Sequence, residues 1–298
     1  LGPTGAIAVD AHCRTSDPDI YAGGDCVECT HRITGQKVFV PLGSTANKHG
    51  RVIGDNLAGR DTRFEGILGT CVFKAFDYTV ARTGLTEHQA RQAGYRVETS
   101  LTPAPDCAHY YPTSRPILVT LVADSTNGRL LGAQVVGSGE CAKRIDVLAA
   151  AMHFGATVDD VPSLDLAYAP PYAGPIDNVA HAANVIRNKR DGVARSITPQ
   201  EVRAKLRNGE DLVLLDVRTP SEIEQMRIED HRVVYIGLGK LRERLSDLPR
   251  DRLIIAYCKV SQRGYEAQRI LAGAGFTNVA FMDGGLVAWP YELKTGGT

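Results

Sequence analysis

Cys258 and Arg263 have the spacing in this sequence best suited to chemistry on sulfur. An apolar run over residues 252–257 predicts a buried strand, and residues 263–274 predict a helix. Cys258 therefore falls at the carboxyl edge of a sheet, where α/β proteins place their sites. Successive amides at a helix start, with a nearby arginine, favour the thiolate, which is the form that attacks sulfur. A reactive thiol is predicted, against the alternative of an inert buried cysteine.

The surrounding residues, 189–298, alternate predicted helices and strands. Thr198 is the expected N-cap of a helix that runs to residue 207, with Glu201 at its third position. Buried strands are expected at 212–217, 252–257 and 278–282, and helices at 239–248 and 263–274. This order predicts an α/β domain with a parallel sheet.

The composition limits the classes of function. The 298 residues hold 34 basic and 34 acidic side chains, which argues against a nucleic-acid partner. No apolar run approaches the roughly 20 residues of a membrane span, and no secretory signal is visible. The seven cysteines show no regular framework, so a cytoplasmic location with free thiols is expected. Residue 1 is Leu, which suggests part of a longer chain.

Two motifs beside the cysteine loop resemble the rhodanese family: residues 215–222, with Asp-x-Arg, and residues 276–289. The resemblance implies that Cys258 accepts a sulfane sulfur as a persulfide and that Arg263 assists. Ser261 stands where the family loop has glycine, and Gly264 stands where it has serine. Residues 226–231 replace the usual Gly-His-Ile-Pro-Gly-Ala stretch, so a degenerate loop remains an alternative.

Residues 1–60 contain a second candidate site, formed by Gly24, Asp25 and a helix expected at 44–57. A strand through 20–22 that ends in glycines would let backbone approach a ligand, and Asp25 would bind a hydroxyl. These residues resemble the second FAD motif of pyridine nucleotide-disulfide reductases. In that family the helix N-terminus, entered here through Pro41, Leu42 and Ala46, faces the flavin.

Residues 61–188 resemble the α+β dimerisation domain of the same family through segments 76–87, 131–137 and 144–146. The whole is similar to coenzyme A disulfide reductases fused to a rhodanese domain. The resemblance implies that Tyr110 and Tyr168 reach the partner subunit's active site in a homodimer. For Tyr111 and Tyr172, interface or core packing is the preferred interpretation.

Two further patterns are interpreted as structural. Residues 137–142 fit Gly-x-Gly-x-x-Ala, but no second parallel strand follows, so tight packing is expected to explain the glycines. Cys26, Cys29 and His31 lack a second ligand pair at usable spacing, and no metal is predicted.

These observations predict the C-terminal part of an FAD- and NAD(P)H-dependent reductase of coenzyme A disulfide, coenzyme A persulfide or polysulfide. The expected architecture is an FAD-domain tail (1–60), a dimerisation domain (61–188) and a rhodanese-like domain (189–298). The chain alone is expected to lack reductase activity. Two alternatives remain: a non-catalytic dimerisation or sulfur-binding fragment, and part of an NADH oxidase or peroxidase of the same flavoprotein group.

Overall fold

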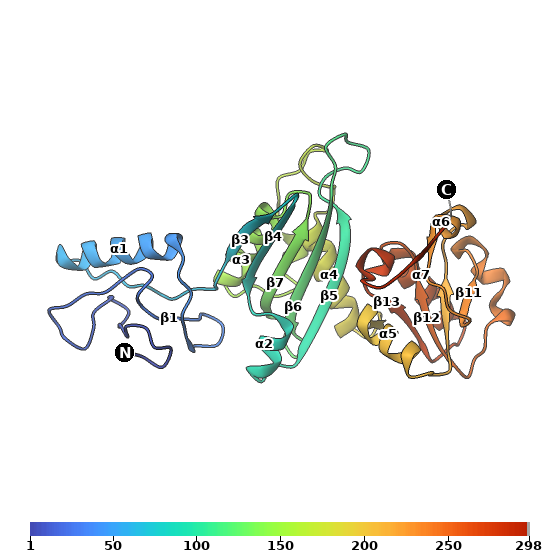
Figure 1. The fold of residues 1–298 in the computed structure, drawn as a ribbon, viewed down its shortest axis with the longest axis horizontal. Coiled ribbons are helices and arrows are strands. Elements are labelled where there is room, and N and C mark those ends of the chain that lie inside the picture. The colour runs from blue at the N-terminus through green and yellow to red at the C-terminus, as the bar shows by residue number, and fades with distance from the viewer. Residues whose placement is uncertain (297–298) are drawn as a thin grey trace.

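The computed structural model describes residues 1–296, and they form three units in a row along the chain (Figure 1). The first unit holds little regular structure apart from one long helix. Its elements are β1 (Cys29–Thr30), β2 (Lys37–Val38) and α1 (Gly43–Leu57). The helix expected at 44–57 is confirmed. The expected strand at 20–22 is wrong: Tyr21 makes only an isolated bridge to Arg14, so this backbone is shaped by turns.

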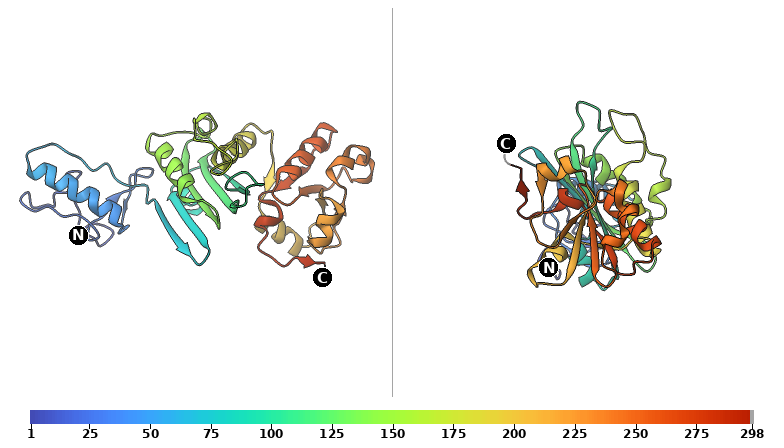
Figure 2. Two further views of the ribbon diagram at one scale, coloured as in Figure 1. Left: turned by 90° about the horizontal axis from the view of Figure 1, so that it is seen from above. Right: turned by 90° about the vertical axis from the view of Figure 1, so that its right-hand side faces the viewer.

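The second unit is a five-stranded antiparallel sheet in the order β3-β4-β7-β6-β5. Helices α3 and α4 lie on the same face of the sheet, as the turned view in Figure 2 shows. Alternate strand residues such as Val119 and Leu121 are fully buried in the core between the layers. The elements are β3 (Cys71–Ala75), β4 (Tyr78–Gly84), α2 (Glu87–Gln92), β5 (Val97–Pro105), β6 (Pro116–Asp124), β7 (Leu130–Gly137), α3 (Ala142–His153), a 3₁₀ turn (Val161–Ser163) and α4 (Asn178–Arg190).

The glycines of the Gly-x-Gly-x-x-Ala pattern serve packing, as expected. Strand β7 runs antiparallel to both of its neighbours, so no dinucleotide-binding crossover exists here. A Cβ on Gly139 would lie 2.7 Å from the carboxyl carbon of Asp106, and one on Gly137 would lie 2.3 Å from the carbonyl oxygen of Pro116.

The third unit is a parallel sheet in the order β11-β9-β12-β13-β8, which confirms the predicted α/β domain. Its faces carry two separate cores: Leu271 of α7 packs on one, and Val202 of α5 packs on the other. The elements are β8 (Ser196–Ile197), α5 (Pro199–Arg207), β9 (Leu212–Asp216), α6 (Pro220–Gln225), β10 (Met226–Arg227), β11 (Val233–Tyr235), β12 (Leu253–Tyr257), α7 (Gln262–Gly273), β13 (Val279–Met282), a 3₁₀ turn (Gly285–Ala288) and β14 (Lys294–Thr295).

Local sequence patterns in this domain predict a helix cap correctly and one helix incorrectly. Thr198 and Glu201 form the predicted capping box at the start of α5. The helix expected at 239–248 is wrong, because the chain makes two short 3₁₀ helices, Leu238–Glu243 and Leu245–Asp247. Arg244 lies between them with φ −120°, outside the helical region, so the leucine spacing at this segment reflects two turns rather than one helix.

A buried contact joins the second and third units. The Lys189 ammonium near the end of α4 lies 2.6 Å from the Asp283 carboxylate, which follows β13, and 2.6 Å from the Thr99 carbonyl oxygen of β5. Both charged side chains are buried. Asp283 also accepts a hydrogen bond from the Ser196 hydroxyl at 2.8 Å. The third unit is therefore connected to the antiparallel sheet by polar contacts as well as by the chain.

Candidate active site

The cysteine loop lies where the sequence predicts it, between the carboxyl end of β12 and the start of α7. Cys258 is fully buried. Its carbonyl oxygen accepts a hydrogen bond from the Leu286 amide at 3.0 Å, and the Lys259 carbonyl accepts one from Val287 at the same distance. A Cβ on Gly285 would lie 2.5 Å from the Cys258 carbonyl oxygen, so only glycine lets this strand-to-turn segment support the loop.

Ser261 has φ +79°, in the left-handed region that favours glycine. The related family has glycine at this position, and the loop retains the shape that glycine allows. The Ser261 hydroxyl donates to the Met282 carbonyl at 3.3 Å, which offsets part of the backbone strain. Ser261 therefore adopts a backbone conformation that glycine at this position would also allow.

Arg263 is held by an acidic partner that the sequence analysis did not identify. Its two terminal nitrogens donate to both carboxylate oxygens of Glu222, at 2.8 and 2.7 Å. The pKa of Arg263 is raised, mainly by these hydrogen bonds, with a smaller contribution from the neighbouring Cys258 thiol. Burial alone would fit an inert cysteine, but an arginine in the same loop as the thiol is typical of a reactive one.

Glu222 is itself fixed in place by the motif at 215–222. Its carboxylate accepts from the Thr219 amide at 3.1 Å and from the Thr219 hydroxyl at 2.9 Å, closing a capping box at the start of α6. Its carbonyl oxygen accepts from Arg218, whose guanidinium forms a buried ion pair with Asp216 at 2.7 Å. The Thr-x-x-Glu spacing could have predicted the cap, but no local signal indicates the pairing with Arg263.

The Glu222–Arg263 pair predicts an acid-dependent loss of stability. Hydrogen bonds from Arg263, and further ones from Thr219, lower the pKa of Glu222 from 4.5 to about 2. Because the folded-state pKa is depressed, the stabilisation is complete above 4.5 and is lost as the pH falls toward 2. Fluorescence of Trp289, the single tryptophan, during denaturation at several pH values measures this loss in the third unit.

Two variants separate this effect from general acid unfolding. Glu222→Gln should be less stable than the wild type at neutral pH, and its stability should decline less between pH 4.5 and 2. Glu201→Gln removes the equivalent capping carboxylate of α5, to which only Thr198 donates among the residues described, and should keep the wild-type acid dependence. The interpretation fails if Glu222→Gln and the wild type lose stability in parallel.

The candidate flavin-binding residues converge on the first turn of α1. Gly24 has φ +83°, and a Cβ there would lie 3.6 Å from the Cβ of Ala46. Asp25 is exposed, as is Pro41, and Leu42 precedes the helix without a side-chain cap. No acidic residue lies in the first turn of α1, so its amides remain able to face an anionic group. These features fit the pyrimidine edge and ribityl chain of a flavin.

His49 is a contributor to this site that the sequence analysis missed. Its Nδ1 accepts a hydrogen bond from the Gly24 amide at 3.1 Å, and its ring is buried. Burial lowers the pKa of His49, which keeps the ring neutral and able to accept. A Cβ on Gly23 would lie 2.9 Å from His49 Cβ. The histidine therefore fixes the glycine turn to α1.

The candidate tyrosines lie on two loops of the second unit that contact each other. Tyr110 is 69% exposed and Tyr168 is 52% exposed. The Ala108 amide donates to the Pro170 carbonyl at 3.1 Å, which joins the β5–β6 loop to the segment before α4. Both loops extend from the same end of the sheet in Figure 1. Tyr172 is also exposed, so core packing does not explain it within this chain.

The side chain of Arg144, on α3, forms hydrogen bonds with both of these loops. Its side chain is 1% exposed and donates to the Asp106 carbonyl, to the Tyr172 carbonyl at 3.4 Å and to the Asp177 carboxylate at 3.1 Å. Asp177 also caps α4 through the Val179 amide. One buried guanidinium thus sets the positions of both tyrosine-bearing segments.

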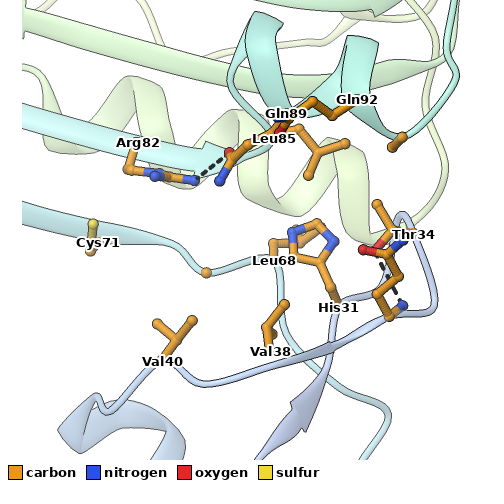
Figure 3. Close-up of a pocket in the computed structure, with 13 residues that line it drawn as sticks. His31, Thr34, Val38, Val40, Leu68, Cys71, Arg82, Leu85, Gln89 and Gln92 are labelled. Atoms are coloured by element: carbon orange, nitrogen blue, oxygen red, sulfur yellow. Dashed lines mark hydrogen bonds between the residues drawn. The ribbon is translucent and has the colours of Figure 1, made fainter. Parts of the chain in front are cut away.

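A cavity of about 430 Å³ lies between the first and second units, and Figure 3 shows its lining. His31 faces it, while Arg82 is turned toward Gln89, to which it donates at 3.3 Å. Burial, with Arg82 nearby, lowers the pKa of His31. None of the predicted site residues line this cavity. Across residues 1–296, no group of three or more histidine, cysteine or acidic side chains is placed to hold a metal ion.

Fold and site together define a chain with an antiparallel α+β domain followed by a parallel α/β domain that carries a cysteine–arginine loop. Residues 70–180 match the family model for the pyridine nucleotide-disulphide oxidoreductase dimerisation domain, and residues 198–291 match the rhodanese-like domain. The chain therefore contains a pyridine nucleotide-disulphide oxidoreductase dimerisation domain followed by a rhodanese-like domain, and the predicted fold class is confirmed. The boundaries at 60 and 188 stay predictions.

Individual relatives agree with this assignment. An NAD(P)H coenzyme A polysulfide/persulfide reductase of Pyrococcus horikoshii is 44% identical over 187 residues, covering 63% of this chain and 42% of that protein. A structure of an NAD-dependent persulfide reductase from A. fulgidus is 47% identical, with a TM-score of 0.90, and covers 97% of this chain and 51% of that one. Reduced CoADR-RHD of Bacillus anthracis is 37% identical with the same TM-score and coverage. The chain thus spans about half the length of these relatives.

Among the described residues, no helix has the length and apolar character needed to cross a bilayer.

Proposed function

We propose that this chain is part of an FAD- and NAD(P)H-dependent reductase of coenzyme A disulfide, coenzyme A persulfide or polysulfide, in which Cys258 carries sulfane sulfur. The observation that carries the proposal is the position of Cys258 at the carboxyl end of β12, in the short loop that leads to Arg263 in the first turn of α7. The reductases of P. horikoshii and A. fulgidus named above support it.

The transfer step needs no redox partner. The Cys258 thiolate attacks the terminal sulfur of a donor persulfide, and a bond forms between Sγ and that sulfur. The donor S–S bond breaks, and its electron pair leaves on the donor thiolate. The proton of the donor stays on the transferred sulfur, so Cys258 becomes a neutral persulfide and the total charge is unchanged. Arg263 and the amides at the start of α7 hold the charged sulfur during the step.

The first unit supplies part of a flavin site in this proposal. Gly24 and Asp25 would hold the ribityl chain. Pro41 and Leu42, which precede α1, and Ala46 in its first turn would face the pyrimidine edge. A bound flavin would pass electrons from NAD(P)H to a disulfide or persulfide sulfur. The role of this chain's residues is to bind and orient it, and the neutral His49 keeps the glycine turn against α1.

A homodimer completes the proposed reductase site. The dimerisation domain supports this assembly, and the exposure of Tyr110 and Tyr168 leaves both phenols able to contact a second subunit. A phenol next to a reacting sulfur can donate a hydrogen bond or a proton. We infer that coenzyme A thiols or persulfides are the substrates that meet these tyrosines.

Sulfur uptake by Cys258 tests the proposal directly. Incubating the full chain with inorganic polysulfide, followed by mass spectrometry of its peptides, should show Cys258 heavier by one sulfur atom. Cys258→Ser should lose all of that uptake, since a hydroxyl does not form a persulfide. Cys26→Ser, which removes an exposed thiol far from the loop, should leave the modification of Cys258 unchanged. An unmodified Cys258 in a folded chain contradicts the proposal.

A further inference from the structure

The ion pair between Glu222 and Arg263 bears on which sulfur donor the loop accepts. Both terminal nitrogens of the arginine are hydrogen-bonded to Glu222, and the pair is partly exposed, with 31% and 27% of the two side chains accessible. The positive charge of Arg263 is thereby already matched by a carboxylate. Lys259, the next residue of the loop, is solvent-exposed.

The carboxylate cannot turn away from Arg263 without breaking other contacts. Glu222 accepts two hydrogen bonds from Thr219, and its backbone is held by Arg218. Arg218 is in turn bound through two nitrogens to the fully buried Asp216. A donor that requires a free guanidinium must therefore displace a carboxylate that Thr219 also holds through two hydrogen bonds.

We propose that Glu222 sets the donor preference of this loop, favouring organic persulfides over thiosulfate. This rests on the proposed function of Cys258. Thiosulfate brings two negative charges beside the transferred sulfur and leaves as sulfite, so it needs unpaired positive charge close to Cys258. With Glu222 in place, thiosulfate, the Cys258 thiolate and the Glu222 carboxylate would bring four negative charges to one guanidinium.

An organic persulfide does not need an unpaired positive charge close to Cys258. Its transferred sulfur is bonded to a sulfur on a carbon chain, and the single negative charge only moves from the Cys258 thiolate to the leaving thiolate. The Glu222–Arg263 pair can remain closed while the S–S bond breaks and the Sγ–S bond forms. Glu222 is thus a specificity-determining residue that acts through Arg263, and it is not itself a catalytic group.

The test compares two donors, cysteine persulfide and thiosulfate, with cyanide as the acceptor. In Glu222→Gln the value of kcat/KM for thiosulfate should rise by about tenfold or more, while that for cysteine persulfide changes less than about twofold. Glutamine preserves the capping box with Thr219, so the substitution removes charge and keeps α6. Trp289 fluorescence verifies that the domain is folded.

Two controls identify the route of the effect. Glu201→Gln alters the same kind of capping box on α5 and should leave both donors unaffected. Adding Arg263→Gln to Glu222→Gln should abolish the gain with thiosulfate, because the released guanidinium is its cause. Sulfite, the product, should inhibit Glu222→Gln more strongly than the wild type, which gives a binding measurement independent of turnover.

The outcomes separate this inference from the proposed function. Sulfur uptake from both donors, with an unchanged donor ratio and unchanged sulfite inhibition in Glu222→Gln, overturns the role of Glu222 alone. A wild-type preference for thiosulfate overturns it as well. A folded chain whose Cys258 takes sulfur from neither donor overturns the proposed function, and the inference with it.

Discussion

Lys189→Met should lower the free energy of unfolding of the rhodanese-like domain by about 3–5 kcal/mol, because it leaves a buried carboxylate without its counter-ion. The Asp283 side chain is 3% exposed and lies 2.6 Å from the Lys189 ammonium. Methionine fills most of the lysine's volume, so the loss reflects charge rather than a cavity. Denaturation followed by Trp289 fluorescence measures the change.

The destabilisation by Lys189→Met should depend on pH in a defined direction. Burial raises the pKa of Asp283, and hydrogen bonds from Lys189 and Ser196 oppose that shift. Without Lys189 the pKa of Asp283 rises further, so the variant folds best with the carboxyl protonated. Its deficit relative to the wild type should be smallest in acid and should grow as the pH rises through the pKa of Asp283.

A surface pair provides the matched control for this prediction. Lys205→Met removes an ion pair with Glu210 in which both side chains are partly exposed, and should cost no more than about 1 kcal/mol. Lys189→Met should also slow sulfur uptake, because Asp283 directly precedes the glycines that support the Cys258 loop. Equal losses in the two variants would mean that the Lys189–Asp283 contact is not a buried pair in solution.

Much of the rhodanese-like domain is predictable because its signals are local. Thr198 and Glu201 mark a helix start by their spacing alone, and the apolar runs of β9 and β12 are long enough to require burial on both faces. The placement of Cys258 follows from such elements, since a residue between a buried strand and a helix must lie at the sheet edge.

The groups that tune these sites could not be predicted because their partners are distant in the chain. Glu222 and Arg263 are 41 residues apart, and Lys189 and Asp283 are 94 apart. No periodicity or cap links such residues, and each resembles an ordinary surface charge in sequence. The role of His49 could not be predicted for the same reason, since its partner Gly24 lies on another segment. The sequence locates the candidate thiol, whereas the tertiary structure identifies the Glu222–Arg263 pair in its loop.

Arg144→Met should destabilise the dimerisation domain by about 3–5 kcal/mol, the usual cost of removing one partner of a buried ion pair. Asp177 would lose its counter-ion, and the Asp106 and Glu140 carbonyls would lose a donor. The segments around Tyr110 and Tyr168 depend on these bonds. Amide hydrogen exchange in both segments should therefore be faster in the variant than in the wild type, and this increase should exceed that in the strands. Calorimetry and hydrogen exchange on the full chain measure the two effects.

The conservative and control variants make the role of Arg144 specific. Arg144→Lys keeps the charge for Asp177 but cannot reach several acceptors at once, so its loss should be intermediate. Arg187→Met, which breaks a half-exposed pair with Asp159, should cost no more than about 1 kcal/mol and leave exchange in both tyrosine loops unchanged. If Arg144→Met lowered stability without faster exchange in those loops, Arg144 would support only the core, and the tyrosines would be positioned by the Ala108–Pro170 backbone bond instead.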